Sequence, residues 1–241
     1  DNPGVTVTQS GGNTAVTEGG ATDTYTLVLT SQPTANVVVN VASGTQLSTA
    51  PTSVTFTSGN WSVAQTVTVA AVDDAIAEGT HNGSVTHTVT SADPNYQGRL
   101  VDSVSVTITD NDTAGVTVTQ SEGNTAVTEG GATDTLSVVL QSQPQSTVTV
   151  TITPNAQLTV SPSPLSFTSA NWNVAQTVTV TAANDVVVEG NHSGTLGFAV
   201  ASSDPAYGSV TLPGITAAIT DNDSAVVSFA PASVSQSEAT S

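Results

Sequence analysis

The sequence predicts an all-β protein built from two tandem antiparallel sandwiches, and three observations support this. Apolar residues alternate with Thr and Ser in short runs such as Val5–Gln9, which is typical of strands with one buried face. Gly, Pro and Asn interrupt these runs, and no run has a convincing helical period. The pattern also repeats, because Trp61 returns as Trp172 and Asp110 returns as Asp221, each 111 residues later.

The length of this repeat sets the domain organisation. A period of 111 residues corresponds to a whole domain, because solenoid units usually have roughly 20–50 residues. We therefore expect a first domain over 1–112, a second over 113–223, and in 224–241 the start of a third repeat or a terminal strand. Asp1 occupies the position of Asp112, so we expect the array to extend upstream as part of a longer chain.

Each repeat contains seven candidate strands bounded by Gly, Pro or Asn. In the first repeat they are 5–9 with 15–17, then 22–30, 36–42, 53–57, 65–72, 83–91 and 101–109. In the second they are 116–120 with 126–128, then 133–141, 147–153, 165–168, 176–182, 194–202 and 210–220. Seven short strands in a domain of this length are typical of an immunoglobulin-like sandwich, here without the cysteine pair. Trp61 and Trp172 are expected to cap one end of each core.

The composition argues against several functions. The chain has 19 acidic residues and one basic residue, Arg99, for a net charge of −18. This balance argues against binding nucleic acid or an anionic membrane surface, because both require Lys and Arg. Without cysteine no disulfide or thiolate metal site can form, and no apolar run is long enough to span a membrane. No Gly-x-Ser-x-Gly nucleophile motif occurs, and we expect no enzymatic activity.

The acidic residues follow a pattern set by strand direction. If successive strands alternate in direction, the first, third and fifth connections and the end of the last strand share one end of the sandwich, which we call the tip. The acids there are Glu18, Asp73, Asp74, Glu78, Asp110 and Asp112 in the first repeat, and Glu129, Asp185, Glu189, Asp221 and Asp223 in the second. Like charges this close are unfavourable unless they are protonated or paired with a cation. Because Ca²⁺ binds roughly 6–8 oxygen ligands, the pattern predicts a calcium site at each tip.

Other interpretations apply to individual residues. Asp and Asn are ordinary turn residues, so each acid alone could be a solvated loop residue. Mg²⁺ prefers stricter octahedral sites, and zinc would require His or Cys. His81 and His192 follow the fifth connection and are expected as exposed turn or strand-start residues. Asp204, in the sixth connection of the second repeat, should face the first tip and could lend it an oxygen.

Four motifs in the chain resemble the Calx-beta domains of sodium–calcium exchangers and bacterial surface proteins. They are 16–20 (Val-Thr-Glu-Gly-Gly), 65–69 (Gln-Thr-Val-Thr-Val) after Phe56, 73–79 (Asp-Asp-Ala-Ile-Ala-Glu-Gly) and 108–112 (Ile-Thr-Asp-Asn-Asp). The resemblance implies a seven-stranded sandwich with calcium at the tip, held by the acids named above. The third connection here carries no acid, and Asn111 interrupts the final acidic run, which implies only one or two ions per tip. Asn184 in place of Asp73 implies a weaker second site.

The leading hypothesis is a structural or adhesive module, a calcium-stiffened stalk of an extracellular or cell-surface bacterial protein. Only 113–115 separate the repeats, and the partners would be neighbouring repeats of the same chain. A second hypothesis is a self-assembling filament or sheath, in which 224–241 adds a strand to another copy. A third is a calcium-sensing pair of regulatory domains, which would need an attached effector domain. Isolated rods in negative-stain images would favour the stalk, and ordered fibres would favour the filament.

Overall fold

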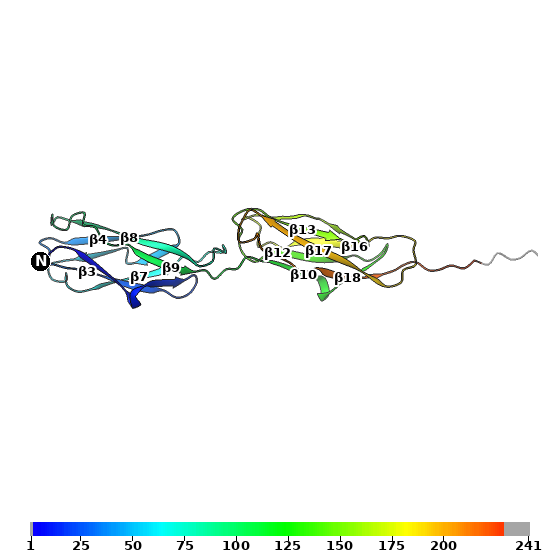
Figure 1. The fold of residues 1–241 in the computed structure, drawn as a ribbon, viewed down its shortest axis with the longest axis horizontal. Coiled ribbons are helices and arrows are strands. Elements are labelled where there is room, and N and C mark those ends of the chain that lie inside the picture. Colours follow the sequence, from blue (N-terminus) through cyan, green and yellow to red (C-terminus); the bar gives the residue numbers. More distant parts are fainter. Residues whose placement is uncertain (1, 229–241) are drawn as a thin grey trace, which may run out of the picture.

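The chain folds into two β-sandwiches arranged end to end (Figure 1). The structure is a computed structural model that describes residues 2–228. Within them, the helical segments are the two short 3-10 turns Ser10–Gly12 and Ser121–Gly123, and no described helix is long and apolar enough to cross a membrane. Residues 224–228 carry no strand. The rest of the expected third-repeat segment lies outside the described residues, as does Asp1.

The first sandwich contains nine strand segments in two sheets. They are β1 (Val5–Gln9), β2 (Thr14–Thr17), β3 (Asp23–Leu29), β4 (Val37–Ser43), β5 (Leu47–Ala50), β6 (Ser53–Phe56), β7 (Gln65–Ala71), β8 (His81–Ser91) and β9 (Val104–Thr109). One sheet has the order β1-β3-β7-β5, and the other has the order β2-β9-β8-β4-β6. The pairs are antiparallel except that β2 runs parallel to β9.

The second sandwich repeats this topology. Its strands are β10 (Val116–Gln120), β11 (Thr125–Thr128), β12 (Asp134–Leu140), β13 (Val148–Pro154), β14 (Leu158–Ser161), β15 (Leu165–Phe167), β16 (Gln176–Ala182), β17 (His192–Ser202) and β18 (Ile215–Thr220). The sheets have the orders β10-β12-β16-β14 and β11-β18-β17-β13-β15. Again one pair, β11 and β18, is parallel.

Two features differ from the strands predicted by the sequence. The predicted third connection contains β5, which pairs with β7, whereas β6 pairs with β4 in the other sheet. The chain therefore changes sheets between Ala50 and Ser53. Alternation is weak here because Leu47 is the one buried residue of β5 and Pro51 interrupts the run. The first predicted strand also divides between the two sheets, as β1 and β2. The prediction of purely antiparallel sheets is wrong, because β2 runs parallel to β9.

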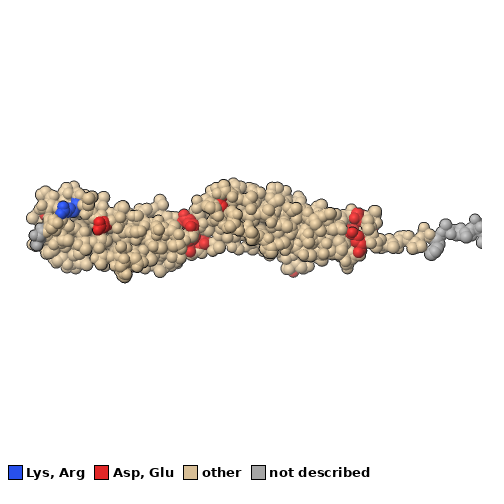
Figure 2. All heavy atoms as spheres, in the orientation of Figure 1, with Lys and Arg blue, Asp and Glu red and all other residues tan. Residues whose placement is uncertain are grey.

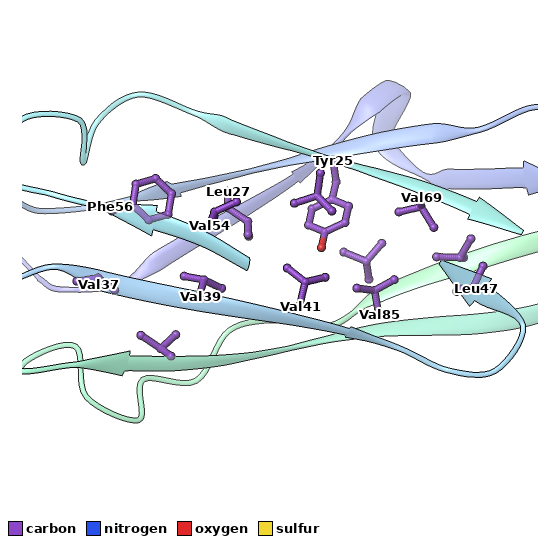
Figure 3. Packing of buried hydrophobic residues seen from close by; sticks show 14 of the residues in the cluster. Tyr25, Leu27, Val37, Val39, Val41, Leu47, Val54, Phe56, Val69 and Val85 are labelled. Atoms are coloured by element: carbon purple, nitrogen blue, oxygen red, sulfur yellow. The ribbon is translucent and has the colours of Figure 1, made fainter. Parts of the chain in front are cut away.

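Each sandwich encloses its own apolar core between its two sheets. Every second side chain of a strand points inward, as in β9, where Val104, Val106 and Ile108 are buried and the residues between them are exposed. Figure 3 shows the side chains of the first core, among them Tyr25 and Phe56, lying between the strands. Burying an aliphatic or aromatic side chain contributes about 1.5–3 kcal/mol, so these cores form a rigid framework for the loops at each end.

The end of each sandwich opposite the tip is closed by aromatic residues. Trp61 and Trp172 are partly buried against the first and second cores. The Trp61 carbonyl accepts a hydrogen bond from the Leu29 N–H, at the end of β3. The Tyr96 hydroxyl donates to the Ser31 carbonyl at 2.6 Å, which joins the sixth connection to the second.

Candidate metal centre

The tip of the first sandwich brings together three segments that are far apart in the sequence. They are the β2–β3 connection with Glu18, the β7–β8 connection 72–80, and the residues just after β9. The Glu18 N–H donates to the Thr109 carbonyl at 3.0 Å, which fixes the first of these segments to the end of β9. Figure 2 shows acidic side chains at the boundary between the two sandwiches and at the far end of the second.

Two groups of side chains at each tip lie close enough to share an ion. In the carboxylate group, Glu18, Asp110 and Asp112 each place one oxygen within 4.8 Å of the others. In the histidine group, Glu18, Glu78 and His81 each place one ligand atom within 4.8 Å of the others. The second tip has the equivalent groups Glu129, Asp221, Asp223 and Glu129, Glu189, His192. One glutamate in each tip therefore belongs to both groups.

The shared glutamate is almost completely buried, at 2% exposed for Glu18 and 1% for Glu129. Oε2 of Glu18 and both carboxylate oxygens of Glu129 have no hydrogen-bond partner among the described residues. Burial raises the pKa of both carboxyls, and the charges of Asp110 and Asp221 raise it further. The one basic side chain, Arg99, donates instead to the Pro3 carbonyl at 2.8 Å. An ionised Glu18 therefore needs a positive partner that Arg99 does not supply.

The two acids after β9 have different roles. Asp110 accepts three backbone hydrogen bonds, from Asp112 N–H at 2.7 Å and from Glu78 and Gly79 N–H at 2.6 Å each. Burial acts to raise the pKa of Asp110, but these three donors, together with the nearby His81, hold the pKa below its ordinary value. In contrast, Oδ2 of Asp112 is buried without a partner among residues 2–228, and burial followed by the charge of Asp110 raises its pKa. Asp110 therefore orders the tip, and Asp112 presents an unpartnered oxygen.

Asn111, between these two acids, joins the first and fifth connections. Its Nδ2 donates to the Glu18 carbonyl at 3.1 Å and to Asp73 Oδ1 at 2.8 Å. In the second tip Asn222 makes the equivalent bonds, with Asn184 Oδ1 at 2.9 Å in place of the aspartate. This position requires an acceptor oxygen, which both Asp73 and Asn184 supply. The Asn184 replacement therefore keeps the geometry and removes one negative charge.

The glycine after the buried glutamate allows this close approach. Gly19 has φ +59°, and a Cβ there would lie 3.0 Å from Asn111 Nδ2 and 3.1 Å from Asp73 Oδ1. At Gly130 a Cβ would lie 2.6 Å from Asn184 Oδ1. A side chain at either position would therefore push the first and fifth connections apart, in addition to the strain of the positive φ.

Three predicted ligands lie at the tips but outside both groups: Asp73, Asp74 and Asp185. Asp73 holds the Asn111 amide, as described above. Asp74 Oδ1 accepts the Ile76 N–H at 2.8 Å, and Asp185 Oδ1 accepts the Val187 N–H at 2.7 Å. The charges of Asp74 and Asp185 nevertheless act on the buried glutamates, because each raises the pKa of the glutamate in its own tip. Their effect is smaller than that of burial and than that of the charge on Asp110 or Asp221.

His81 and His192 were expected as exposed turn or strand-start residues after the fifth connection, and the structure places them at strand starts but not fully exposed. Each begins a strand, and the side chains are 23% and 19% exposed. Their Nε2 atoms are buried and have no hydrogen-bond partner in the described part of the chain. Their recurrence at the same 111-residue offset as the acids is the signal that could have identified them.

The acid-free third connection also contributes to the tip. Gln46 Nε2 donates to Glu78 Oε2, and in the second repeat Gln157 Nε2 donates to Glu189 Oε1 at 3.1 Å. An amide therefore orients the glutamate of each histidine group. Gln46 and Gln157 were not predicted from the sequence, because glutamine is common and carries no charge.

The first tip also forms one side of the joint between the sandwiches. The Gln143 N–H of the second sandwich donates to the Ala75 carbonyl of the β7–β8 connection at 2.6 Å. Beside this bond lies a cleft of about 700 Å³, whose walls include Glu78, His81 and Asp112. The two candidate ligand groups of the first tip thus have members that face the second sandwich.

Asp204 lines the same cleft from the second sandwich. The expectation that it lends an oxygen to the first tip is not supported by its hydrogen bonds. Its Oδ2 accepts the Gln145 N–H at 2.7 Å and its Oδ1 accepts the Ala206 N–H at 3.0 Å, both within its own sandwich. Asp204 is buried and shapes the turn after β17.

Comparison with known proteins gives weak structural similarities. No family model matches the chain, and no curated protein matches it. Solved structures with some likeness include the apo-form Calx CBD1 domain (TM-score 0.34, 16% identity, 45% of this chain and 98% of that chain) and CBD12 from CALX1.2 (0.35, 16%, 90% and 99%). The titin domains z1z2 in complex with telethonin are similar at 0.38 and 12%, over 93% and 98% of the two chains. At these TM-scores, a metal site can be inferred only from the tip residues themselves.

Proposed function

We propose that the chain is a tandem array of Calx-beta-type sandwiches whose tips bind Ca²⁺, and that it serves as a stalk. The observation that carries this proposal is Glu18, which is buried beside Asp110 and Asp112 with an unpartnered Oε2 among the described residues. A cation among these carboxylates would remove their repulsion and supply the missing partner. Ca²⁺ suits the carboxylate group because it takes oxygen ligands in irregular geometry, with water completing the coordination.

Calcium at the first tip would act on the joint through the β7–β8 connection. Asp110 holds the backbone of Glu78 in that connection, and Ala75 in the same connection contacts Gln143 of the second sandwich. An ion that holds Asp112 against Glu18 would fix both the chain after β9 and this connection. Bending between the sandwiches would then be restricted, which is the property a stalk requires.

The small carboxylate group favours a calcium-rich environment. The carboxylate group of the first tip has three members, Glu18, Asp110 and Asp112, and this small number suits the weak affinities, roughly 10⁻⁴–10⁻³ M, of extracellular calcium modules. We therefore place the protein outside the cell or at the cell surface, as part of a structural or adhesive protein. A net charge of −18 disfavours nucleic acid as a partner and leaves neighbouring repeats of the same chain as the expected contacts.

A matched pair of variants tests both parts of this proposal. Asp112→Asn removes the unpartnered oxygen of the first tip, and Asp223→Asn removes its equivalent in the second. Each variant should lose the calcium-dependent stabilisation of its own sandwich, about 2.7 kcal/mol at a hundredfold excess over Kd. Only Asp112→Asn should also lose a calcium-dependent stiffening in small-angle scattering, because only the first tip lies at the joint between the described sandwiches.

The exposed Asp102, which lies outside both tips, supplies the control variant Asp102→Asn. Its melting temperature should respond to calcium as the wild type does. A wild-type melting curve that is the same in EDTA and in calcium would sink the calcium site. Equal loss of stiffening in both tip variants would leave the site intact and contradict the role in the joint.

The exposed loop of the second tip favours a second candidate function, a self-assembling filament or sheath. Val186, Val187 and Val188 are 86%, 56% and 52% exposed. The counterpart of Val186 in the first repeat is Ala75, whose carbonyl accepts a hydrogen bond from Gln143 of the second sandwich. A second copy that docked its first sandwich on these valines would extend the array without a covalent link. Sedimentation velocity tests this, because concentration-dependent growth lost in Val187→Ser would support assembly and a constant monomer would contradict it.

A further inference from the structure

The histidine group of each tip has a buried ring nitrogen that lacks a hydrogen-bond partner among the described residues. His81 Nδ1 lies 2.9 Å from the Gly79 carbonyl oxygen. A carbonyl oxygen only accepts, so Nδ1 must carry the hydrogen in this contact. In the neutral ring Nε2 then has a lone pair. This lone pair is buried without a hydrogen-bond partner in residues 2–228, and it lies 3.6 Å from Glu78 Oε2.

The second tip has the same arrangement. His192 Nδ1 lies 2.9 Å from the Gly190 carbonyl, and its Nε2 lies 3.4 Å from Glu189 Oε2 and 3.8 Å from Glu129 Oε1. Lone pairs on a nitrogen and two carboxylates that face one another repel. The repulsion is removed if a positive species lies between them, either a proton on Nε2 or a metal ion.

The residues around the ring favour the metal over the proton. Glu18 and Glu129 are more than nine-tenths buried and present unpartnered oxygens to this position, as judged over the described residues. The outer partners of the other ligands are also in place, because Gly79 holds the ring of His81 and Gln46 holds the carboxylate of Glu78. Hydrogen bonds that fix a ligating imidazole through its second nitrogen, and a ligating carboxylate through an amide, are typical of metal sites.

The ligand types indicate the class of metal. Calcium takes oxygen ligands, whereas imidazole nitrogen suits Zn²⁺ and the other late first-row divalent ions. We propose that His81 with Glu18 and Glu78, and His192 with Glu129 and Glu189, form a second cation position at each tip that takes a dication of the Zn²⁺ class. This position adjoins the carboxylate group through the shared glutamate, but it does not require calcium there. In the first repeat it opens into the cleft at the joint.

The chain offers a simple test because it contains only three histidines. Titration of untagged protein with Zn²⁺ by calorimetry should give two ions per chain. Co²⁺ should bind at the same positions and give a visible absorption spectrum that indicates coordination by the imidazole nitrogen. The double variant His81→Asn, His192→Asn should bind Zn²⁺ at least tenfold more weakly and lose the Co²⁺ signature. His87→Gln is the matched control, since both ring nitrogens of His87 already have partners, Tyr25 OH and the Asp102 carbonyl.

The variants separate this proposal from the calcium proposal. Asp112→Asn with Asp223→Asn should abolish the calcium response and leave two Zn²⁺ ions bound, because Asp112 and Asp223 lie outside the histidine groups. Melting curves in EDTA establish that each variant is folded. The proposal is overturned if the wild type binds no Zn²⁺ up to millimolar concentration, or if the double histidine variant keeps the wild-type affinity and spectrum. In the first case each histidine contacts its neighbouring glutamate, Glu78 or Glu189, without a metal ion between them.

Discussion

The two tips carry equivalent ligand groups but have different surroundings. The first tip faces the second sandwich across a cleft, and Ala75 in its β7–β8 connection accepts a hydrogen bond from Gln143. The equivalent connection of the second tip carries Val186, Val187 and Val188, and all three side chains are exposed to solvent. The same loop therefore forms part of a joint in one repeat and an apolar surface in the other. The ligand groups are a property of each sandwich alone, whereas the joint also requires a neighbouring sandwich.

The tips also differ in charge at one position. Asp73 and Asn184 accept the same amide hydrogen bond from Asn111 and Asn222. The geometry is therefore matched while the charge differs by one. This makes the pair of tips a natural comparison of how much a nearby carboxylate outside both groups would contribute to the proposed cation binding.

A third difference lies in the cores. In the first, Tyr25 OH lies 2.9 Å from His87 Nε2, with the two rings edge to face at 5.5 Å. At the equivalent positions the second sandwich has Leu136 and Phe198. A polar, titratable pair in one sandwich thus replaces an apolar pair in the other, without a change of topology.

The largest effect is expected from neutralising the buried glutamates. Glu18→Gln with Glu129→Gln removes two buried carboxylates that lack partners among the described residues. In EDTA the variant should melt several degrees above the wild type, because an unpaired buried charge is unfavourable. In saturating calcium the order should reverse, because the wild type gains about 2.7 kcal/mol at a hundredfold excess over Kd and the variant does not. A variant that is less stable in both conditions would mean that Glu18 and Glu129 stabilise the fold without a metal.

An intermediate effect is expected from exchanging the charge at the matched position. Asp73→Asn should weaken calcium binding at the first tip, and Asn184→Asp should strengthen it at the second, each on the order of tenfold or about 1.4 kcal/mol. The physical reason is the loss or gain of one nearby negative charge while the hydrogen bond from the asparagine is kept. Calorimetry in chains whose other tip carries Asp223→Asn or Asp112→Asn isolates each site. Unchanged affinities would show that this charge is screened from the ion.

The smallest effect is expected from the core pair. Burial lowers the pKa of His87 below its ordinary value of 6.5, although the bond to the Asp102 carbonyl opposes this. As the pH falls below 6.5, His87 of the unfolded chain therefore binds a proton that His87 of the folded chain does not. The first sandwich loses stability with falling pH until the pH reaches the pKa of His87 in the folded state. Phe198 gives the second sandwich no such dependence.

Copying the apolar pair into the first sandwich tests this difference. Tyr25→Leu with His87→Phe should remove this pH dependence from the melting temperature of the first sandwich, measured in EDTA. The pH dependence that arises from the tips should stay the same in the variant and the wild type. An identical slope in both proteins over this pH range would contradict the assignment to His87.

Much of the architecture could be predicted because it depends on local patterns. Alternation over β9 and the recurrence of Trp61 at Trp172 were sufficient for the all-β class and the tandem sandwiches. The strand β5 was missed because a four-residue edge strand with one buried side chain has too little alternation to detect. The parallel pairing of β2 with β9 was missed because a strand that changes sheets looks continuous in the sequence.

The acidic residues that reach the tip could be identified from the sequence, because strand alternation sends successive connections to opposite ends. What each of them does at the tip became clear from the folded structure. Glu18 is buried without a partner among the described residues, Asp110 is held by three backbone donors, and His81 turns its Nε2 toward two carboxylates. These properties depend on burial and on hydrogen bonds between segments that are distant in the chain. The residue type alone does not determine burial or hydrogen bonding, and for this reason Asp110 and Asp112, two residues apart, have different roles.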